Sequence, residues 1–117
     1  MKRIITIALA LAGATAAASA QDIGGIYLVE GTNLDGSAYE GTAEIMLTSE
    51  TTCEIMWDTG SVSNGICSRN GNAFAAAYVL EDVVGLVIYQ VQSDGTLDGL
   101  WTIAGQEGVG TETLTPE

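Results

Sequence analysis

The segment Tyr39-Glu40-Gly41-Thr42-Ala43-Glu44-Ile45-Met46-Leu47 alternates between two kinds of side chain. The apolar or small residues fall on one face: Tyr39, Gly41, Ala43, Ile45 and Leu47. The polar residues fall on the other: Glu40, Thr42 and Glu44. Successive side chains of a β-strand point to opposite faces, so this period of two predicts a strand with one buried face.

Similar short runs continue along the chain and are separated by turn signals. The expected strands are 25–32, 38–48, 52–58, 62–69, 73–80, 84–92, 97–104 and 109–115. Asn70-Gly71 and Asp94-Gly95 are typical of tight hairpins because both residue pairs tolerate positive φ. The Ala-rich run 74–78 is the least certain, since Ala favours helix. The sequence predicts an all-β fold, an antiparallel eight-stranded up-and-down meander.

We expect the meander to close into a small barrel, because closure removes its two exposed edges. The first strand should then pair with the eighth near Thr111-Glu112-Thr113. Five aromatic side chains should point into one interior and form a tentative ligand-binding set: Tyr27, Tyr39, Trp57, Tyr89 and Trp101. Four carboxylates should point to solvent, since charges are costly to bury unpaired: Glu40, Glu44, Glu54 and Asp98.

Two segments of the chain have a similar pattern. Residues 26–29 precede Asp35-Gly36, and residues 88–91 precede Asp94-Gly95 in the same way. An internal duplication and a coincidence between two hairpins are both compatible with this pattern. Either reading predicts strand, Asp-Gly turn, strand for both segments.

The first twenty residues have the pattern of a secretory signal peptide. Lys2 and Arg3 precede an apolar stretch, 4–12, and Ala18-Ser19-Ala20 is a small-x-small cleavage site. A membrane anchor is the alternative, but the apolar stretch is shorter than the roughly 20 residues that a span needs. We expect residues 1–20 to be removed, leaving 21–117 as a single β-barrel domain in the periplasm or outside the cell.

Composition restricts the possible functions. Removal of residues 1–20 leaves 97 residues with one Arg, 15 carboxylates, no Lys and no His, a net charge of −14. One cation cannot neutralise several phosphates, so we expect no nucleic-acid partner and no binding to anionic membranes. Triads that need His and pairs that need Lys are excluded. We expect no metal, no cofactor and no enzymatic activity.

The two cysteines predict the pairing of one hairpin. Cys53 and Cys67 are symmetric about Gly60, so they face each other in a hairpin centred there. Opposed Cβ atoms lie about 4.5–5.5 Å apart, which is close enough for a bridge after slight adjustment. Export would supply an oxidising compartment. Free thiols and a redox pair are the alternatives, but a structural disulfide is favoured.

Two acidic motifs need separate interpretation. Asp58-Thr59-Gly60-Ser61 resembles the aspartic-protease signature, and such an enzyme would require a dimer that supplies two Asp residues. The segment also reads as a simple hairpin tip. Asp94-x-Thr96-x-Asp98-Gly99 matches the start of an EF-hand loop, but Gly105 occupies the position of the bidentate Glu. A hairpin turn is the favoured interpretation of the second motif.

Gly25-x-Tyr27 and Gly99-x-Trp101, together with eight short strands, resemble the avidin and lipocalin barrels. Most of the mature chain also resembles a group of small exported bacterial proteins of unknown function, some of which carry a fibronectin-binding label. The similar segments are 31–37, 70–78 and 94–101. This resemblance supplies no catalytic or ligand residues.

The favoured function is therefore that of an exported, non-enzymatic binding protein. Its partner would be a small apolar ligand in the barrel mouth or a protein at the rim. The alternatives are a periplasmic protease inhibitor and a dimeric aspartic-type hydrolase that uses Asp58. A cavity of several hundred Å³ would support a ligand binder, whereas a filled lumen would favour the rim.

The first prediction concerns the N-terminus. The exported protein should begin at Gln21, because signal peptidase cleaves after a small-x-small motif. N-terminal sequencing of the protein recovered from the periplasm or medium checks this. An exported chain that still contains Lys2 would contradict it.

Overall fold

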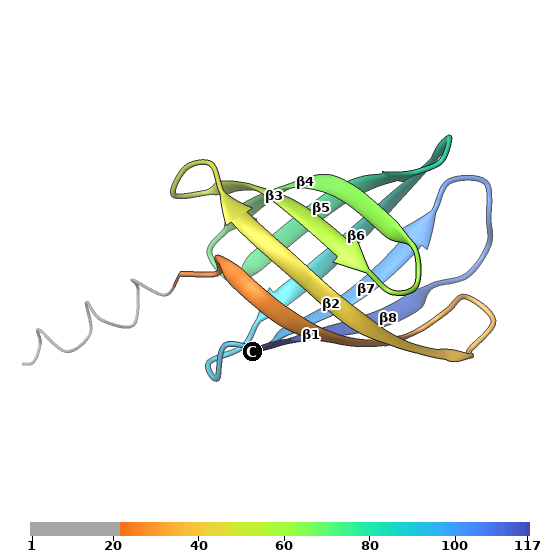
Figure 1. Ribbon diagram of the computed structural model, residues 1–117, viewed down its shortest axis with the longest axis horizontal. Helices are drawn as coiled ribbons and strands as arrows, with labels where there is room; N and C mark the ends of the chain where they lie inside the picture. Colours follow the sequence, from red (N-terminus) through yellow and green to blue (C-terminus); the bar gives the residue numbers. More distant parts are fainter. Residues whose placement is uncertain (1–21) are drawn as a thin grey trace, which may run out of the picture.

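The computed structural model describes residues 22–117, and the predicted signal peptide lies outside the described residues. Eight antiparallel strands form one closed barrel in simple sequence order (Figure 1). The strands are β1 (Gly25–Thr32), β2 (Ala38–Leu47), β3 (Thr52–Asp58), β4 (Val62–Asn70), β5 (Ala73–Leu80), β6 (Val83–Val91), β7 (Leu97–Ile103) and β8 (Gly110–Pro116). Among residues 22–117 no helix is long and apolar enough to span a membrane.

The barrel closes where β1 meets β8, as the sequence predicts. Val29 pairs with Leu114, and Gly31 pairs with Glu112, in an antiparallel register. β1 pairs with β2 along its other edge, so neither edge strand is left open. The Ala-rich run is strand β5, which is bonded to β4 on one side and β6 on the other. Pairing on both sides therefore overrides the helix propensity of Ala.

The two similar segments form the same turn. In the β1–β2 connection the Gly36 N–H donates to the Asn33 carbonyl at 2.9 Å. In the β6–β7 connection the Gly95 N–H donates to the Gln92 carbonyl at 3.0 Å. Both glycines have positive φ, 88° and 92°, which a residue with a side chain rarely adopts. The predicted strand, turn, strand arrangement is confirmed in both places.

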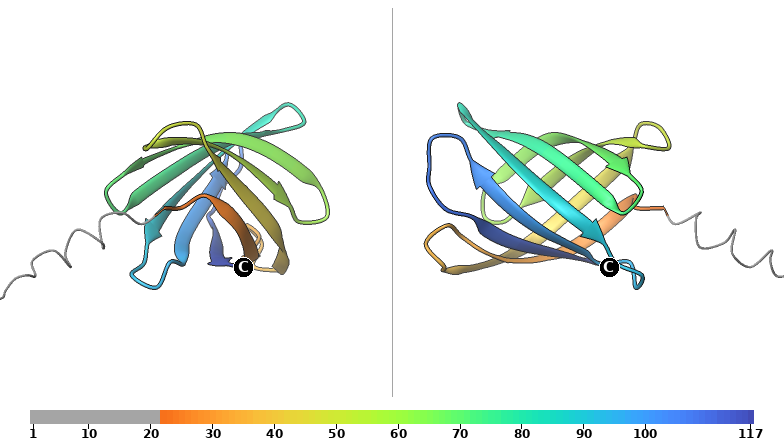
Figure 2. Two further views of the ribbon diagram at one scale, coloured as in Figure 1. Left: turned by 60° about the vertical axis from the view of Figure 1, so that its left-hand side comes forward. Right: turned by 180° about the vertical axis from the view of Figure 1, so that it is seen from behind.

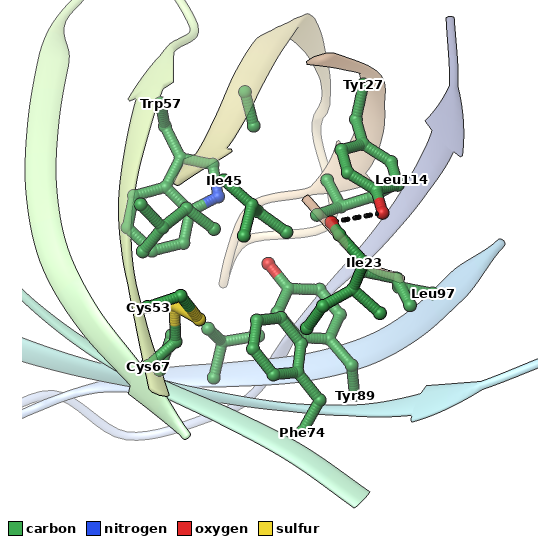
Figure 3. Close-up of a cluster of buried hydrophobic side chains, with 14 of the residues drawn as sticks. Ile23, Tyr27, Ile45, Cys53, Trp57, Cys67, Phe74, Tyr89, Leu97 and Leu114 are labelled. Atoms are coloured by element: carbon green, nitrogen blue, oxygen red, sulfur yellow. Dashed lines mark hydrogen bonds between the residues drawn. A yellow bond between two sulfur atoms is a disulfide. The ribbon is translucent and has the colours of Figure 1, made fainter. Parts of the chain in front are cut away.

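One end of the barrel interior is filled by side chains, and we call it the filled end. Phe74 stacks on Tyr89 with ring centroids 5.4 Å apart, and Figure 3 shows the two rings side by side. Ile23, which precedes β1, lies in the same cluster, and its carbonyl accepts a hydrogen bond of 2.7 Å from the Tyr27 hydroxyl. Leu97 and Leu114 are fully buried beside them. No room for a ligand is expected in so filled a layer.

The predicted faces are confirmed for most residues. The five predicted aromatic side chains are buried or half-buried, and Glu40, Glu54 and Asp98 are exposed. Glu44 lies on the outer face but is half-buried. Leu47 was expected inside and is instead exposed, because it ends β2 at the barrel rim, beyond the packed layer.

Cys53 and Cys67 form the predicted disulfide. They are directly paired across β3 and β4, with Cα atoms 4.9 Å apart. Both side chains are buried inside the barrel (Figure 3). The turn that joins the strands is centred on Gly60, as the symmetry of the two positions predicts. The bridge is compatible with an oxidising compartment.

The second prediction concerns this bridge. Replacing both cysteines with Ala should lower the free energy of unfolding by about 3 kcal/mol, since the bridge closes a loop of roughly 15 residues in the unfolded chain. Chemical denaturation of the oxidised protein and of the Cys53→Ala/Cys67→Ala variant measures the difference. Equal midpoints and equal slopes for the two proteins would contradict a structural role for the disulfide.

Candidate functional site

The opposite end of the barrel is open, and we call it the mouth. The β1–β2, β3–β4, β5–β6 and β7–β8 connections surround it. They lie together on the right in Figure 1 and on the left in the reverse view of Figure 2. A pocket of about 290 Å³ lies inside the mouth. Its lining residues are Asn33, Tyr39, Trp57, Thr59, Ser63, Tyr78, Leu80, Val87, Trp101, Ile103 and Glu112.

The pocket contains one buried carboxylate, that of Glu112, which is 7% exposed. The Tyr39 hydroxyl donates to its Oε1 at 2.7 Å, and the Trp57 Nε1–H donates to its Oε2 at 2.9 Å. The Tyr89 hydroxyl also donates to Oε2. The three donors come from β2, β3 and β6, and all three are neutral. They fix the position of the carboxylate and offset part of the cost of its burial.

Glycines on the strands beside Glu112 make room for its donors. Glu112 pairs with Gly31 on β1 and with Gly99 on β7. A Cβ on Gly31 would lie 2.6 Å from the Tyr39 hydroxyl oxygen, and one on Gly99 would lie 2.5 Å from Cδ1 of Tyr89. Each tyrosine ring therefore lies across a glycine to reach the carboxylate, a close approach that any larger residue would block.

Four aromatic rings form walls around the carboxylate. Tyr39 and Trp101 meet edge to face with centroids 6.2 Å apart. Trp57 and Tyr78 meet edge to face with centroids 5.1 Å apart. The four rings come from β2, β7, β3 and β5, so they enclose the pocket from several sides. Aromatic walls with one fixed polar group are typical of small-molecule sites.

The tyrosines of the mouth are held in their neutral form. Burial, and then the nearby charge of Glu112, raise the pKa of Tyr39 and of Tyr89 far above the ordinary value. The same two causes raise the pKa of Tyr78 to about 12. Tyr39 and Tyr89 therefore remain hydrogen-bond donors to the carboxylate over the whole physiological pH range.

The structure separates the five predicted ligand-binding residues into two groups. Tyr39, Trp57 and Trp101 line the mouth pocket. Tyr27 belongs to the filled end, and Tyr89 is fully buried beneath the pocket, where it positions the Glu112 carboxylate.

Sequence reasoning missed Glu112 and Tyr78. Alternation along β8 carries a signal for Glu112, because Gly110, Glu112 and Leu114 share one face and Leu114 must point inward. The Ala-rich composition of β5 obscured Tyr78, which points into the same interior as Ala76.

The two acidic motifs both lie in turns. Asp58 is exposed at the β3–β4 tip, and its Oδ1 accepts a hydrogen bond of 3.2 Å from the Gly60 N–H. Asp94 accepts from the N–H and the hydroxyl of Thr96, at 3.0 and 2.8 Å, which lowers the pKa of its carboxyl. Within residues 22–117 no group of three or more His, Cys, Asp or Glu side chains is placed to hold a metal ion.

No protein-family model matches the sequence, and no curated protein matches it. Solved structures of designed β-barrels share its fold. A redesigned beta barrel aligns with a TM-score of 0.68 over 86% of this chain and 95% of its own. A de novo designed fluorescence-activating beta barrel aligns with a TM-score of 0.61 over 86% of this chain and 97% of its own. Each is 18% identical to this chain, so the similarity establishes a small eight-stranded β-barrel and nothing further.

The third prediction concerns alkaline pH. Folding raises the tyrosine pKa values above their ordinary 10.0, so folded tyrosines keep protons that unfolded ones release. The free energy of unfolding should be insensitive to these groups below pH 10 and fall as the pH rises from 10 towards 12. Denaturation curves at a series of pH values, with tyrosinate absorbance recorded in parallel, measure this.

The Tyr78→Phe variant is the matched control for that series, because it removes one titrating hydroxyl and keeps the ring. Its stability should fall less steeply above pH 10 than that of the wild type. Tyrosinate formation in the folded protein at the pH of free tyrosine would contradict the burial of these hydroxyls.

Proposed function

We propose that this protein is an exported, non-enzymatic binding protein that holds a small ligand in the mouth of its barrel. The observation that carries the proposal is the pocket of about 290 Å³, which has aromatic walls and a single buried carboxylate. Sites for small molecules are concave and mostly apolar, with a few fixed polar groups. The mouth has each of these properties.

The size of the pocket favours a compact ligand. Typical small-molecule sites occupy roughly 300–1,000 Å³, and this one lies at the lower limit. The buried side chains of Phe74, Tyr89 and their neighbours fill the interior beneath the pocket. Lipocalins and streptavidin show that an eight-stranded barrel can hold one small ligand. The ligand would enter between the hairpin tips and stop at Glu112.

Export is part of the proposal. The signal-peptide pattern of residues 1–20 and the disulfide between Cys53 and Cys67 both favour a periplasmic or secreted protein.

A protein partner is the second candidate, and the outer surface of the barrel favours it. Exposed apolar side chains gather on neighbouring strands β4 to β7: Ile66, Val79, Val84, Leu86, Ile88 and Leu100. Contiguous exposed apolar surface of this kind is typical of interaction sites. This surface lies outside the barrel, so a protein could bind there while the mouth holds a ligand.

The fourth prediction tests the mouth as a ligand site. Benzyl alcohol, benzylamine and benzoate are compact probes that share one apolar ring and differ in charge. At least one should change the fluorescence of Trp57 and Trp101 in a saturable way, since both indoles line the pocket. The absence of a saturable response to all three, with the fold intact, would contradict the proposed function.

Two variants of one strand show where the probe binds. Ser63→Phe places a ring at the pocket wall and should weaken binding more than about tenfold. Ser68→Phe introduces the same ring on the exposed outer face of β4 and should leave binding unchanged. If the probe binds the two variants with equal affinity, its binding site lies outside the mouth.

A further inference from the structure

We propose that the mouth pocket selects a small organic cation, a quaternary or protonated ammonium group, with Glu112 as its counter-ion. This inference rests on the proposed function and names the chemical class of its ligand. It is carried by three features of the described residues: the charge of the pocket, the nature of its walls and the polar side chains of its lining.

The first feature is a buried negative charge whose hydrogen-bond partners are neutral. Tyr39, Trp57 and Tyr89 all donate to Glu112, and none of them carries a positive charge. Arg69, the one Lys or Arg within residues 22–117, lies near the filled end, where its Nε–H donates to the Gly71 carbonyl at 2.8 Å. A cation in the mouth would supply the neutralising charge that these donors lack.

The free-energy cost of burying the Glu112 carboxylate argues that this residue has a function. Burial of a carboxylate is unfavourable even when hydrogen bonds satisfy its oxygens, and an apolar side chain of similar size would stabilise the barrel more simply. Departures from the preferred packing of a fold are concentrated at functional sites. Glu112 is the one buried charged residue among residues 22–117, and it lines the pocket of about 290 Å³ in the mouth.

The second feature is the aromatic wall. Trp57, Tyr78, Tyr39 and Trp101 surround the space next to the carboxylate. The negative face of an aromatic ring attracts a cation, most strongly for Trp and in a desolvated site. Quaternary ammonium groups are recognised by such rings because they have no N–H to donate and carry their charge over apolar methyl groups. Val87 and Ile103 add apolar surface for these methyl groups.

The third feature is a set of polar, uncharged side chains in the pocket lining near the hairpin tips. Asn33, Thr59 and Ser63 line the outer part of the pocket. They can exchange hydrogen bonds with a hydroxyl or amide attached to the cation. The mature chain carries a net charge of −14, which attracts cations towards the mouth and repels anions. An anionic ligand would meet both this field and Glu112.

The fifth prediction uses three probes of one shape and different charge. They are choline, its uncharged isostere with a tert-butyl group in place of trimethylammonium, and the tert-butylacetate anion. Isothermal titration of residues 21–117, with tryptophan fluorescence as a second signal, measures each affinity. Choline should bind roughly tenfold or more tightly than the uncharged isostere, and the anion should not bind.

Two variants separate the role of Glu112 from that of the overall charge. Glu112→Gln keeps the shape of the side chain and should weaken choline binding roughly ten- to hundredfold, with the uncharged isostere unaffected. Glu40→Gln removes the same charge from the exposed outer face of β2 and should leave both affinities unchanged. Thermal unfolding of each variant confirms that the barrel is intact. The wild-type comparison of probes remains decisive if Glu112→Gln does not fold.

The outcomes distinguish this inference from the proposed function. Saturable binding of the uncharged isostere as tight as that of choline would overturn the cation preference while leaving a ligand site in the mouth. Binding of choline that is equal in both variants, and that is lost at high salt, would assign it to the acidic surface and overturn the role of Glu112. No binding of any probe, here or in the benzyl series, would count against both proposals.

Discussion

Closure of β1 onto β8 is the constraint on which the rest of this structure depends. An open meander of eight strands would expose two rows of unpaired backbone groups and would leave one face of the sheet in water. Pairing Gly31 with Glu112, and Val29 with Leu114, removes both edges in one step. The same register carries Glu112 to the side of β1 and within reach of Tyr39 on β2. The fold and the candidate site therefore have a common origin.

The interior divides into two layers with different physical character. At the filled end, Phe74, Leu97 and the ring of Tyr89 pack in a mainly apolar layer, and the Tyr89 hydroxyl reaches from it to Glu112. At the mouth, tyrosine rings lie against glycines and reach the Glu112 carboxylate, and a pocket remains beside them. The first layer supplies the stability that allows the second to contain a buried charge. The disulfide between β3 and β4 adds to the same layer.

The alternation of apolar and polar side chains predicts much of the fold. It predicts the candidate site only in part. Period two predicts the strands and the inward aromatic residues because successive side chains of a strand point to opposite faces of the barrel wall. The alternation does not predict how far along the barrel axis a side chain lies, because that position depends on the stagger between strands. Tyr27 and Tyr39 therefore look alike in the sequence but lie at opposite ends of the barrel.

Glu112 shows a second limit of the same reasoning. The rule that carboxylates face solvent holds for Glu40, Glu54 and Asp98, which are exposed on the outer face of the barrel. It fails for Glu112, since neutral donors from three strands converge on it. Those donors are 73, 55 and 23 residues away in sequence, so no local pattern can reveal them.

A crystal structure of residues 21–117 grown with choline would show both the position of the ligand and its counter-ion. We expect a closed barrel with the trimethylammonium group inside the mouth, against the Glu112 carboxylate and the rings of Trp57 and Trp101. Tyr39, Trp57 and Tyr89 should still donate to that carboxylate. A Glu112 side chain turned out to solvent, or choline bound only to the outer surface of the barrel, would contradict this expectation.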